Sequence, residues 1–108
     1  MNTLLALLLI YRAANRLPPV RTDTLACRVA VERILEVKTD WSHKGFFANH
    51  IVAKSGYAWQ ENLAKNFVNP VDVMNAWKKS PTHNKNLLSN MKRVCFMHFG
   101  NYWVMEGY

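Results

Sequence analysis

Three polar side chains in this sequence, His43, Glu61 and His83, have the types and surroundings that chemistry needs. Glu61 lies in a stretch rich in apolar and aromatic residues, where a carboxylate needs partners because burying it alone costs free energy. Both histidines lie where a loop meets an expected helix. Imidazole nitrogens and a carboxylate bind zinc well, and imidazole exchanges protons near neutral pH. The residue types predict a metal site or an acid–base group, and by spacing alone they equally allow three unrelated side chains.

Other reaction classes find no support in the sequence. It contains no nucleophile elbow, no phosphate-binding loop and no metalloprotease helix motif. The two remaining histidines, His50 and His98, lack comparable surroundings, and His98 is expected on a strand that faces solvent. A binding role is therefore favoured over an enzymatic one.

The composition is that of one folded domain spanning residues 1–108. Half of the residues are apolar and 12% are aromatic, which is enough for a packed core. The net charge is +7, which favours anionic partners such as nucleic acid, acidic lipid or anionic cell-wall polymers. Because the basic residues are scattered and do not alternate with aromatic residues, we do not expect nucleic acid among the partners.

The two cysteines, Cys27 and Cys95, leave the redox compartment open. They could form one disulfide that closes a long loop, or they could be two buried thiols. Two cysteines this far apart do not make a four-ligand zinc knuckle.

The apolar run over residues 4–11 has the length of a signal-peptide core and is far too short to span a bilayer. No basic residue precedes it, and Ala13-Ala14 is a weak cleavage site. We therefore expect a buried helix there, neither a leader peptide nor a transmembrane segment.

Proline and glycine positions and the spacing of apolar residues predict the elements. Helices are expected over 3–16, 22–38, 46–51, 69–79 and 81–88, a strand or irregular segment over 57–64, and a hairpin of strands 94–99 and 102–105. Helices come first and strands late, which is typical of an α+β fold with helices packed on an antiparallel sheet. The residues expected to be buried on the second and fourth helices are Cys27, Ala30, Val31, Ile34, Leu35, Val71, Met74 and Trp77.

Several short motifs, in order along the chain, resemble those of the CAP superfamily, which includes cysteine-rich secretory proteins, venom antigen 5 and plant pathogenesis-related proteins. Residues 60–64, Gln-Glu-Asn-Leu-Ala, resemble its Gly-Glu-Asn-Leu/Ile-Ala box. Residues 77–88 resemble its Trp-x-x-Ser-x-x-His-x-x-Asn-Ile/Leu-Leu box in the short bacterial style. Residues 42–46, 11–20 and 101–104 are similar to its Ser-His segment, its first helix with a Leu-Pro-Pro turn, and its closing strand.

The resemblance implies an α–β–α sandwich with a polar cleft that holds two histidines and two glutamates, sometimes with a divalent cation. His43 and His83 match the two histidines, with His50 as an alternative for the first, and Glu61 matches the first glutamate. The second glutamate is matched poorly, because Ser80 stands where animal members place it. Asn62, Trp77 and Ser80 are expected to support the cleft, and zinc is the expected cation if one binds.

The resemblance implies a ligand-binding domain that acts at or outside a cell surface, with a protein, a lipid or a cell-wall polymer as its partner. One alternative is a hydrolase in which a histidine acts as base, while Glu61 orients it or holds a metal-bound water. Another is a structural component of a larger assembly, such as a virion or envelope particle.

Overall fold

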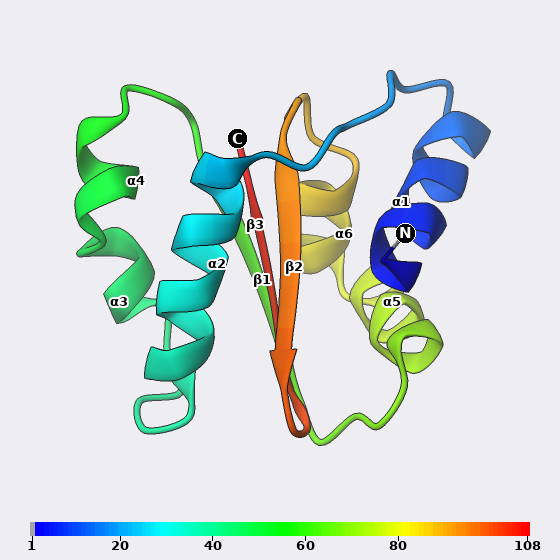
Figure 1. Cartoon of the computed structure of the whole chain (residues 1–108). Coiled ribbons are helices and arrows are strands. Elements are labelled where there is room, and N and C mark those ends of the chain that lie inside the picture. Colours follow the sequence, from blue (N-terminus) through cyan, green and yellow to red (C-terminus); the bar gives the residue numbers. More distant parts are fainter. Residues whose placement is uncertain (1) are drawn as a thin grey trace.

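The computed structural model describes residues 2–108. Its helices are α1 (Thr3–Ala14), α2 (Thr24–Val37), α3 (Lys44–Phe47), α4 (His50–Lys54), α5 (Pro70–Lys79) and α6 (Pro81–Leu87). Its strands are β1 (Gln60–Lys65), β2 (Val94–Phe99) and β3 (Tyr102–Gly107). These elements are shown in Figure 1.

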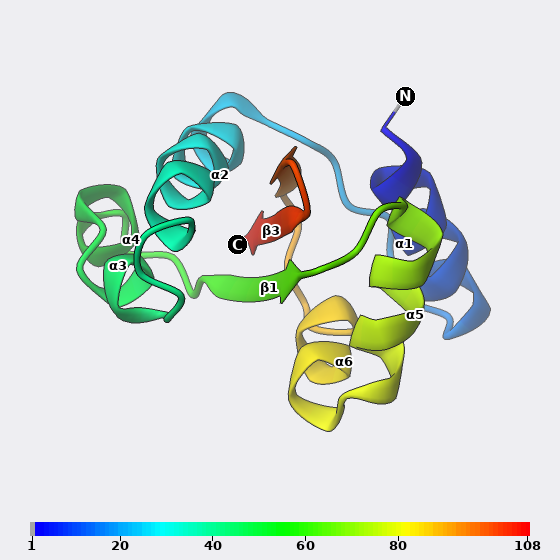
Figure 2. The same ribbon diagram turned by 90° about the horizontal axis from the view of Figure 1, so that it is seen from below.

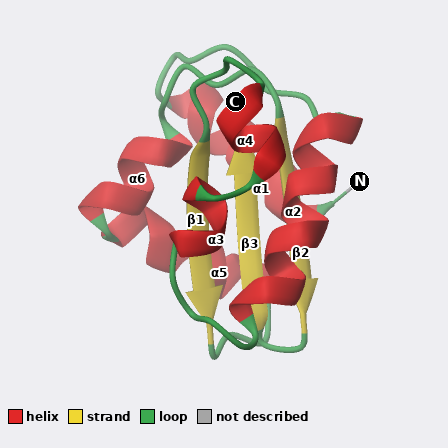
Figure 3. Cartoon of the chain, turned by 90° about the vertical axis from the view of Figure 1, so that its left-hand side faces the viewer, coloured by secondary structure: helices red, strands yellow, loops and turns green. Residues whose placement is uncertain are grey.

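The strands form one antiparallel sheet in the order β1-β3-β2, so the last strand of the chain is the central one (Figure 3). One face of the sheet is covered by α2, with α3 and α4 outside it, and the other face by α1, α5 and α6 (Figures 1 and 2). The expected three-layer α–β–α sandwich of the α+β class is therefore confirmed.

Two apolar cores lie on the two faces of the sheet, because side chains alternate along each strand. The larger core packs α1, α5 and α6 against β2 and β3 around Leu8, Trp77 and Phe96. The smaller core packs α2 against the other face around Ala30, Leu63 and Val104. The apolar run near the N-terminus contributes Leu4 and Leu8 to the larger core, as a buried helix should.

Several helices begin at a side chain that accepts backbone hydrogen bonds from their first turn. Asn2, Asp23 and Asn69 play this part for α1, α2 and α5. Asn49 does so for α4, and it divides the expected helix over 46–51 into α3 and α4. The uncertain segment before Ala64 is strand β1, and the expected hairpin is β2 and β3.

The expected buried face of α2 is partly wrong. Val31 and Leu35 are 43% and 58% exposed, while the buried stripe runs through Val29, Arg33 and Val37. An arginine in the middle of that stripe hid the true helical periodicity from a reading of apolar residues alone. On α5, Val71 is likewise exposed and Val73 is buried in its place.

A buried arginine ties the first helix to the second half of the chain. Arg12 is 1% exposed. It donates to the carbonyl oxygen of Pro18 at 3.1 Å and to those of Leu87 and Ser89 at 3.0 and 2.6 Å. These bonds satisfy carbonyl groups at the end of α6, where a helix leaves acceptors unpaired.

No helix within residues 2–108 has both the length and the apolar character required to cross a bilayer.

Cys27 on α2 and Cys95 on β2 form a disulfide, which links the helix to the sheet across 68 residues of sequence. We predict that the double change Cys27→Ser, Cys95→Ser lowers the free energy of unfolding by about 3–5 kcal/mol, because the unfolded chain gains conformational freedom. Urea unfolding followed by tryptophan fluorescence measures the loss. Reductant should destabilise the wild type and leave the variant unchanged; two free thiols in the oxidised wild type would contradict the assignment.

Candidate functional site

The centre of the site is a buried ion pair between Arg33 on α2 and Glu61 on β1. Both side chains are 1% exposed. Arg33 Nε donates to Glu61 Oε2 at 2.7 Å, and Nη2 donates to Glu61 Oε1 at 3.1 Å. This two-bond arrangement is the strongest geometry between a guanidinium and a carboxylate, and it fixes Glu61 in one orientation.

His43 lies between this buried pair and the solvent. Its Nδ1 is 2.8 Å from Glu61 Oε1, and its side chain is 47% exposed. Since an ionised carboxylate only accepts hydrogen bonds, Nδ1 carries the proton and donates it. In the neutral ring Nε2 is then an acceptor, free to act as a base or to bind a ligand.

Arg33 also determines how the chain presents His43. Nη2 donates to the carbonyl oxygen of Ser42 at 2.6 Å, directly before the histidine. A Cβ at Gly45 would collide with Arg33 Nη1 and lie 2.6 Å from Glu36 Oε2. Glycine at this position therefore leaves the space that the guanidinium occupies.

A second glutamate lies beside Glu61. Glu106 on β3 is its cross-strand partner in the register and is fully buried. Within residues 2–108 neither of its carboxyl oxygens has a hydrogen-bond partner. Burial, together with the neighbouring Glu61 carboxylate, raises the pKa of Glu106 well above its ordinary value. Glu106 is therefore a neutral acid beneath the site.

The pKa of Glu61 is shifted in the opposite direction to that of Glu106. Burial by itself would raise the pKa of Glu61, but the hydrogen bonds from Arg33 and His43 outweigh it and lower that pKa. Burial would also lower the pKa of Arg33, yet its bonds to Glu61 raise it. The pKa values of two neighbouring carboxyls of the same type are thus shifted in opposite directions.

His83 lies on α6, which is on the other side of the edge strand β1 from α3 (Figure 2). Burial lowers the pKa of His83, and the charge of His43 lowers it further. Its backbone carbonyl accepts a bond from Asn62 Nδ2 at 3.1 Å. Asn86 Nδ2 in turn donates to Asn62 Oδ1 at 2.9 Å and to the Glu61 carbonyl at 3.2 Å. Asn62 therefore joins α6 to the strand that carries Glu61.

The other two expected supporting residues have different places. Trp77 is buried, and its Nε1 donates to the carbonyl oxygen of Leu63 at 3.1 Å, which covers the outer edge of β1. Ser80 lies at the junction of α5 and α6, where it precedes Pro81. The second carboxyl group of the site is that of Glu106 on β3. The position where animal members place a glutamate is occupied here by Ser80.

His50, the alternative for the first histidine of the cleft, lies outside the site. His50 Nε2 is 3.0 Å from Glu32 Oε2, and Asn49 Nδ2 donates to Glu32 Oε1 at 3.0 Å, so the pair fastens α4 to α2. His98 is exposed on β2 and stacks on Trp103 with ring centroids 4.5 Å apart.

A divalent cation fits these residues poorly. Both oxygens of Glu61 already accept bonds, from Arg33 and His43. In the part of the chain that the structure describes, no three His, Cys, Asp or Glu side chains are grouped so that they could hold a metal ion. Five hollows on the surface are lined by residues other than His43, Glu61 and His83. The cation and the cleft stay predictions.

Two residues of the site were not expected from the sequence. Glu106 is a lone acid in an otherwise apolar strand after Trp103, Val104 and Met105, which is a signal that it needs a partner. Arg33 is flanked by Ile34 and falls on the helical stripe of Val29 and Val37. A charged residue in an apolar stripe predicts a buried ion pair. For Arg33 the acidic partner is Glu61.

We predict that Glu106→Gln gains stability over the wild type as pH rises from about 4 to about 7. The native state holds Glu106 neutral with a raised pKa, so its stabilisation is complete below the ordinary glutamate pKa and is lost as pH rises toward the folded value. Glutamine stays neutral throughout. Urea unfolding at several pH values gives the difference, and Glu36→Gln, half-exposed on α2, controls for a lost carboxylate. Parallel stability curves for Glu106→Gln and the wild type would contradict a buried neutral acid.

We predict that His43→Ala raises the pKa of His83, because the charge of His43 holds it down. Burial still acts in the variant, so the pKa of His83 should rise without reaching the ordinary value. The titration of the ring protons by NMR measures this shift. His50→Ala is the matched control, since His50 also pairs with a glutamate at the surface. Equal titration of His83 in the wild type and His43→Ala would show that the two rings are not close.

Comparison with known proteins begins with the sequence, of which residues 5–97 match the family model described as "CAP: Cysteine-rich secretory protein family". The search of the curated proteins finds no match. Among solved structures, a cysteine-rich secretory protein from Staphylococcus aureus is similar with a TM-score of 0.85 at 13% identity, over 97% of this chain and 36% of that one.

An extracellular protein with an SCP domain from Bacillus anthracis is similar with a TM-score of 0.86 at 20% identity, over 99% of this chain and 39% of that one. An outer surface protein from Borrelia burgdorferi gives 0.81 at 20% identity, over 96% of this chain and 87% of that one. The chain thus spans little more than a third of the first two proteins. At these identities the structural likeness establishes the fold, and the match over residues 5–97 establishes the family. The chain belongs to the CAP, or cysteine-rich secretory protein, family.

Proposed function

We propose that this chain is a ligand-binding CAP domain that acts outside the cell, and that its ligand binds at His43 and His83. The observation that carries the proposal is the bond from His43 Nδ1 to the buried carboxylate of Glu61, 2.8 Å long. It fixes the tautomer of a half-exposed ring, so that Nε2 accepts a hydrogen bond from a hydroxyl or an amide.

The charge around the site supports an anionic ligand. Lys44 follows His43, and Lys85 lies two residues after His83; both lysines are exposed. Glu61 is paired with Arg33, and the pKa of Glu106 is raised, so these two buried acids add little negative charge beside the lysines. A ligand that combines hydroxyl groups with negative charge matches these partners, as in anionic cell-wall polymers or acidic lipid headgroups.

Two further observations support an extracellular role. The Cys27–Cys95 disulfide is of a kind that persists in oxidising compartments and is rare in the cytosol. The similar structures include one described as an extracellular protein and one as an outer surface protein.

A hydrolase is less well supported than a binding domain. Glu61 is buried with both oxygens in hydrogen bonds, so it is not available to activate a water or to attack a substrate. It can orient His43, which leaves that ring as the single accessible base beside a partly buried His83.

The test is a titration of isotope-labelled protein with three probes, followed by amide NMR shifts. They are a poly(glycerol phosphate) polymer, vesicles containing phosphatidylserine, and a neutral polysaccharide. We predict that one anionic probe shifts the amides around His43 and His83, and that His43→Ala weakens its binding about tenfold, as the loss of one hydrogen bond implies.

His50→Ala should bind like the wild type, because it removes an equally exposed histidine from a different glutamate. Equal losses in both variants, or no shifts near His43, would refute the site. A separate titration with zinc alone, followed by calorimetry, tests whether a cation binds. Zinc uptake that disappears in the double variant His43→Ala, His83→Ala would assign the metal to the two rings. Unchanged uptake would rule the rings out as its ligands.

A further inference from the structure

The two outer edges of the sheet are covered very differently. On β1, side chains satisfy the outward carbonyl groups: Asn86 donates to Glu61 at 3.2 Å and Trp77 donates to Leu63 at 3.1 Å. On β2, a single isolated bridge covers the first residue. The amide of Val94 donates to the carbonyl of Arg21 at 2.9 Å, and the chain then turns away toward α2.

Beyond Val94 the β2 edge becomes accessible toward its C-terminal end, since Phe96 is 6% exposed and His98 is exposed. In an antiparallel pair, successive residues alternate between bonding to the partner strand and facing outward. Since Val94 bonds outward, Phe96 and His98 also direct their amide and carbonyl groups away from β3. Over residues 2–108 no backbone hydrogen bond outside the β2–β3 pairing reaches either of them. Such an edge is a template for another strand.

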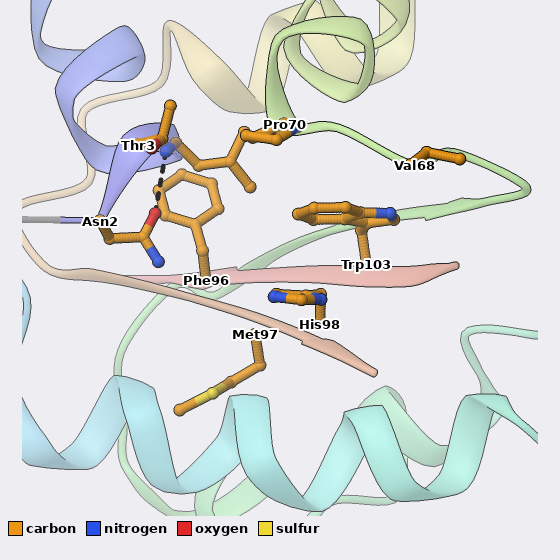
Figure 4. Close-up of a pocket in the computed structure, with 9 residues that line it drawn as sticks. Asn2, Thr3, Val68, Pro70, Phe96, Met97, His98 and Trp103 are labelled. Carbon is orange, nitrogen blue, oxygen red and sulfur yellow. Dashed lines mark hydrogen bonds between the residues drawn. The ribbon is translucent and has the colours of Figure 1, made fainter. Parts of the chain in front are cut away.

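A groove follows this open edge. One hollow of about 370 Å³ has Phe96 and Trp103 on its floor and Pro70 on its wall (Figure 4), and Leu4 of α1 also lines it. A second hollow, of about 190 Å³, shares Asn2 and Phe96 with the first and continues past Val94 to Thr22. The groove therefore begins where the bridge at Arg21 ends and runs along β2 to His98.

The shape of the groove suits an extended chain. In a strand laid on β2, alternate side chains point to the face of the sheet that carries α1 and α5. One of them would enter the larger hollow, where Figure 4 shows Phe96 and Trp103 pointing to that face and Met97 pointing to the other. Backbone bonds to an edge combined with a pocket for one side chain are the features of peptide recognition by strand addition.

The charges around the groove favour an acidic occupant. No Asp or Glu lines either hollow. Arg21 and Arg93 lie at one end, where Arg93 also pairs with Asp23 at 3.8 Å, and Lys38 lies over the ring of Phe99 at 3.8 Å near the other. The first turn of α1, which carries no acid of its own, borders the larger hollow, and the N-terminus of a helix attracts negative charge. A second copy of this chain fits worse, because its basic ends would meet these and each copy carries +7.

We propose that the outer edge of β2 binds an extended acidic segment of a partner protein, which adds to the sheet as a fourth strand and places one side chain on Phe96 and Trp103. This site lies on the edge of the sheet opposite to β1 and Glu61, so it is separate from the site proposed above for the CAP-type ligand.

The probe is a fluorescent peptide of about six residues, the length of an ordinary strand, that alternates valine and aspartate. A peptide that alternates valine and lysine is the charge control. Anisotropy gives the affinity, and amide exchange by NMR locates the peptide. We expect exchange at Phe96 and His98 to slow, while Val94, whose amide is already bonded, stays unchanged.

The decisive variant is His98→Pro, because proline removes an outward donor from an edge strand and leaves the bonds to β3 in place. We expect it to weaken the acidic peptide about tenfold. His98→Thr keeps the donor and should bind as the wild type does, and His43→Ala should bind normally because it alters only the opposite side. Unfolding curves for all variants confirm that they are folded.

Three results would overturn the proposal. The first is no binding of the acidic peptide at about 1 mM, where even weak complexes form. The second is equal binding by His98→Pro and His98→Thr. The third is a concentration-dependent dimer that protects Phe96 and His98 without peptide, which would assign the edge to a second copy of this chain.

Discussion

The pair of Arg33 and Glu61 is the interaction on which the rest of the site depends. Two opposite charges buried together are stable only if their bonds are well formed, since desolvation opposes their attraction. Here the guanidinium makes two bonds to the carboxylate, and it holds the carbonyl of Ser42 as well. One side chain thus joins α2, β1 and the loop before α3. Removing either partner would leave a lone charge in the core.

The neighbours of this pair follow from its charges. Glu106 lies opposite Glu61 in the sheet and remains neutral, because a second carboxylate without its own cation would be unfavourable there. His43 uses the outer oxygen of Glu61 and so fixes its own tautomer. Position 45 favours glycine, because the Cβ of any other residue would enter the space of the guanidinium. His43 is therefore the residue through which the buried charges of Arg33 and Glu61 contact the solvent.

The sequence predicted most of the fold, and it predicted His43 and Glu61 as partners. The helix caps and the glycine turn are local signals, so the helices and the hairpin were accessible. Arg33 and Glu106 were missed because their roles depend on contacts between elements: the helix face of one, and the strand register of the other. The same contacts explain why Val31 and Leu35 were wrongly expected to be buried. A helix face that includes an arginine is taken for a solvent-exposed face unless the buried acid that pairs with the arginine is known.

The place of β3 has a consequence for how this chain is made. The central strand, Tyr102–Gly107, is the last element, so β1 and β2 have no common neighbour until synthesis has passed Gly107. Until then Glu61 lacks Glu106 beside it, and both flanking strands leave the backbone groups that face β3 unpaired. Pairing that waits for distant residues is slow, and it leaves the nascent chain open to wrong contacts. The helices can form early, but the sheet can close only after β3 has been made.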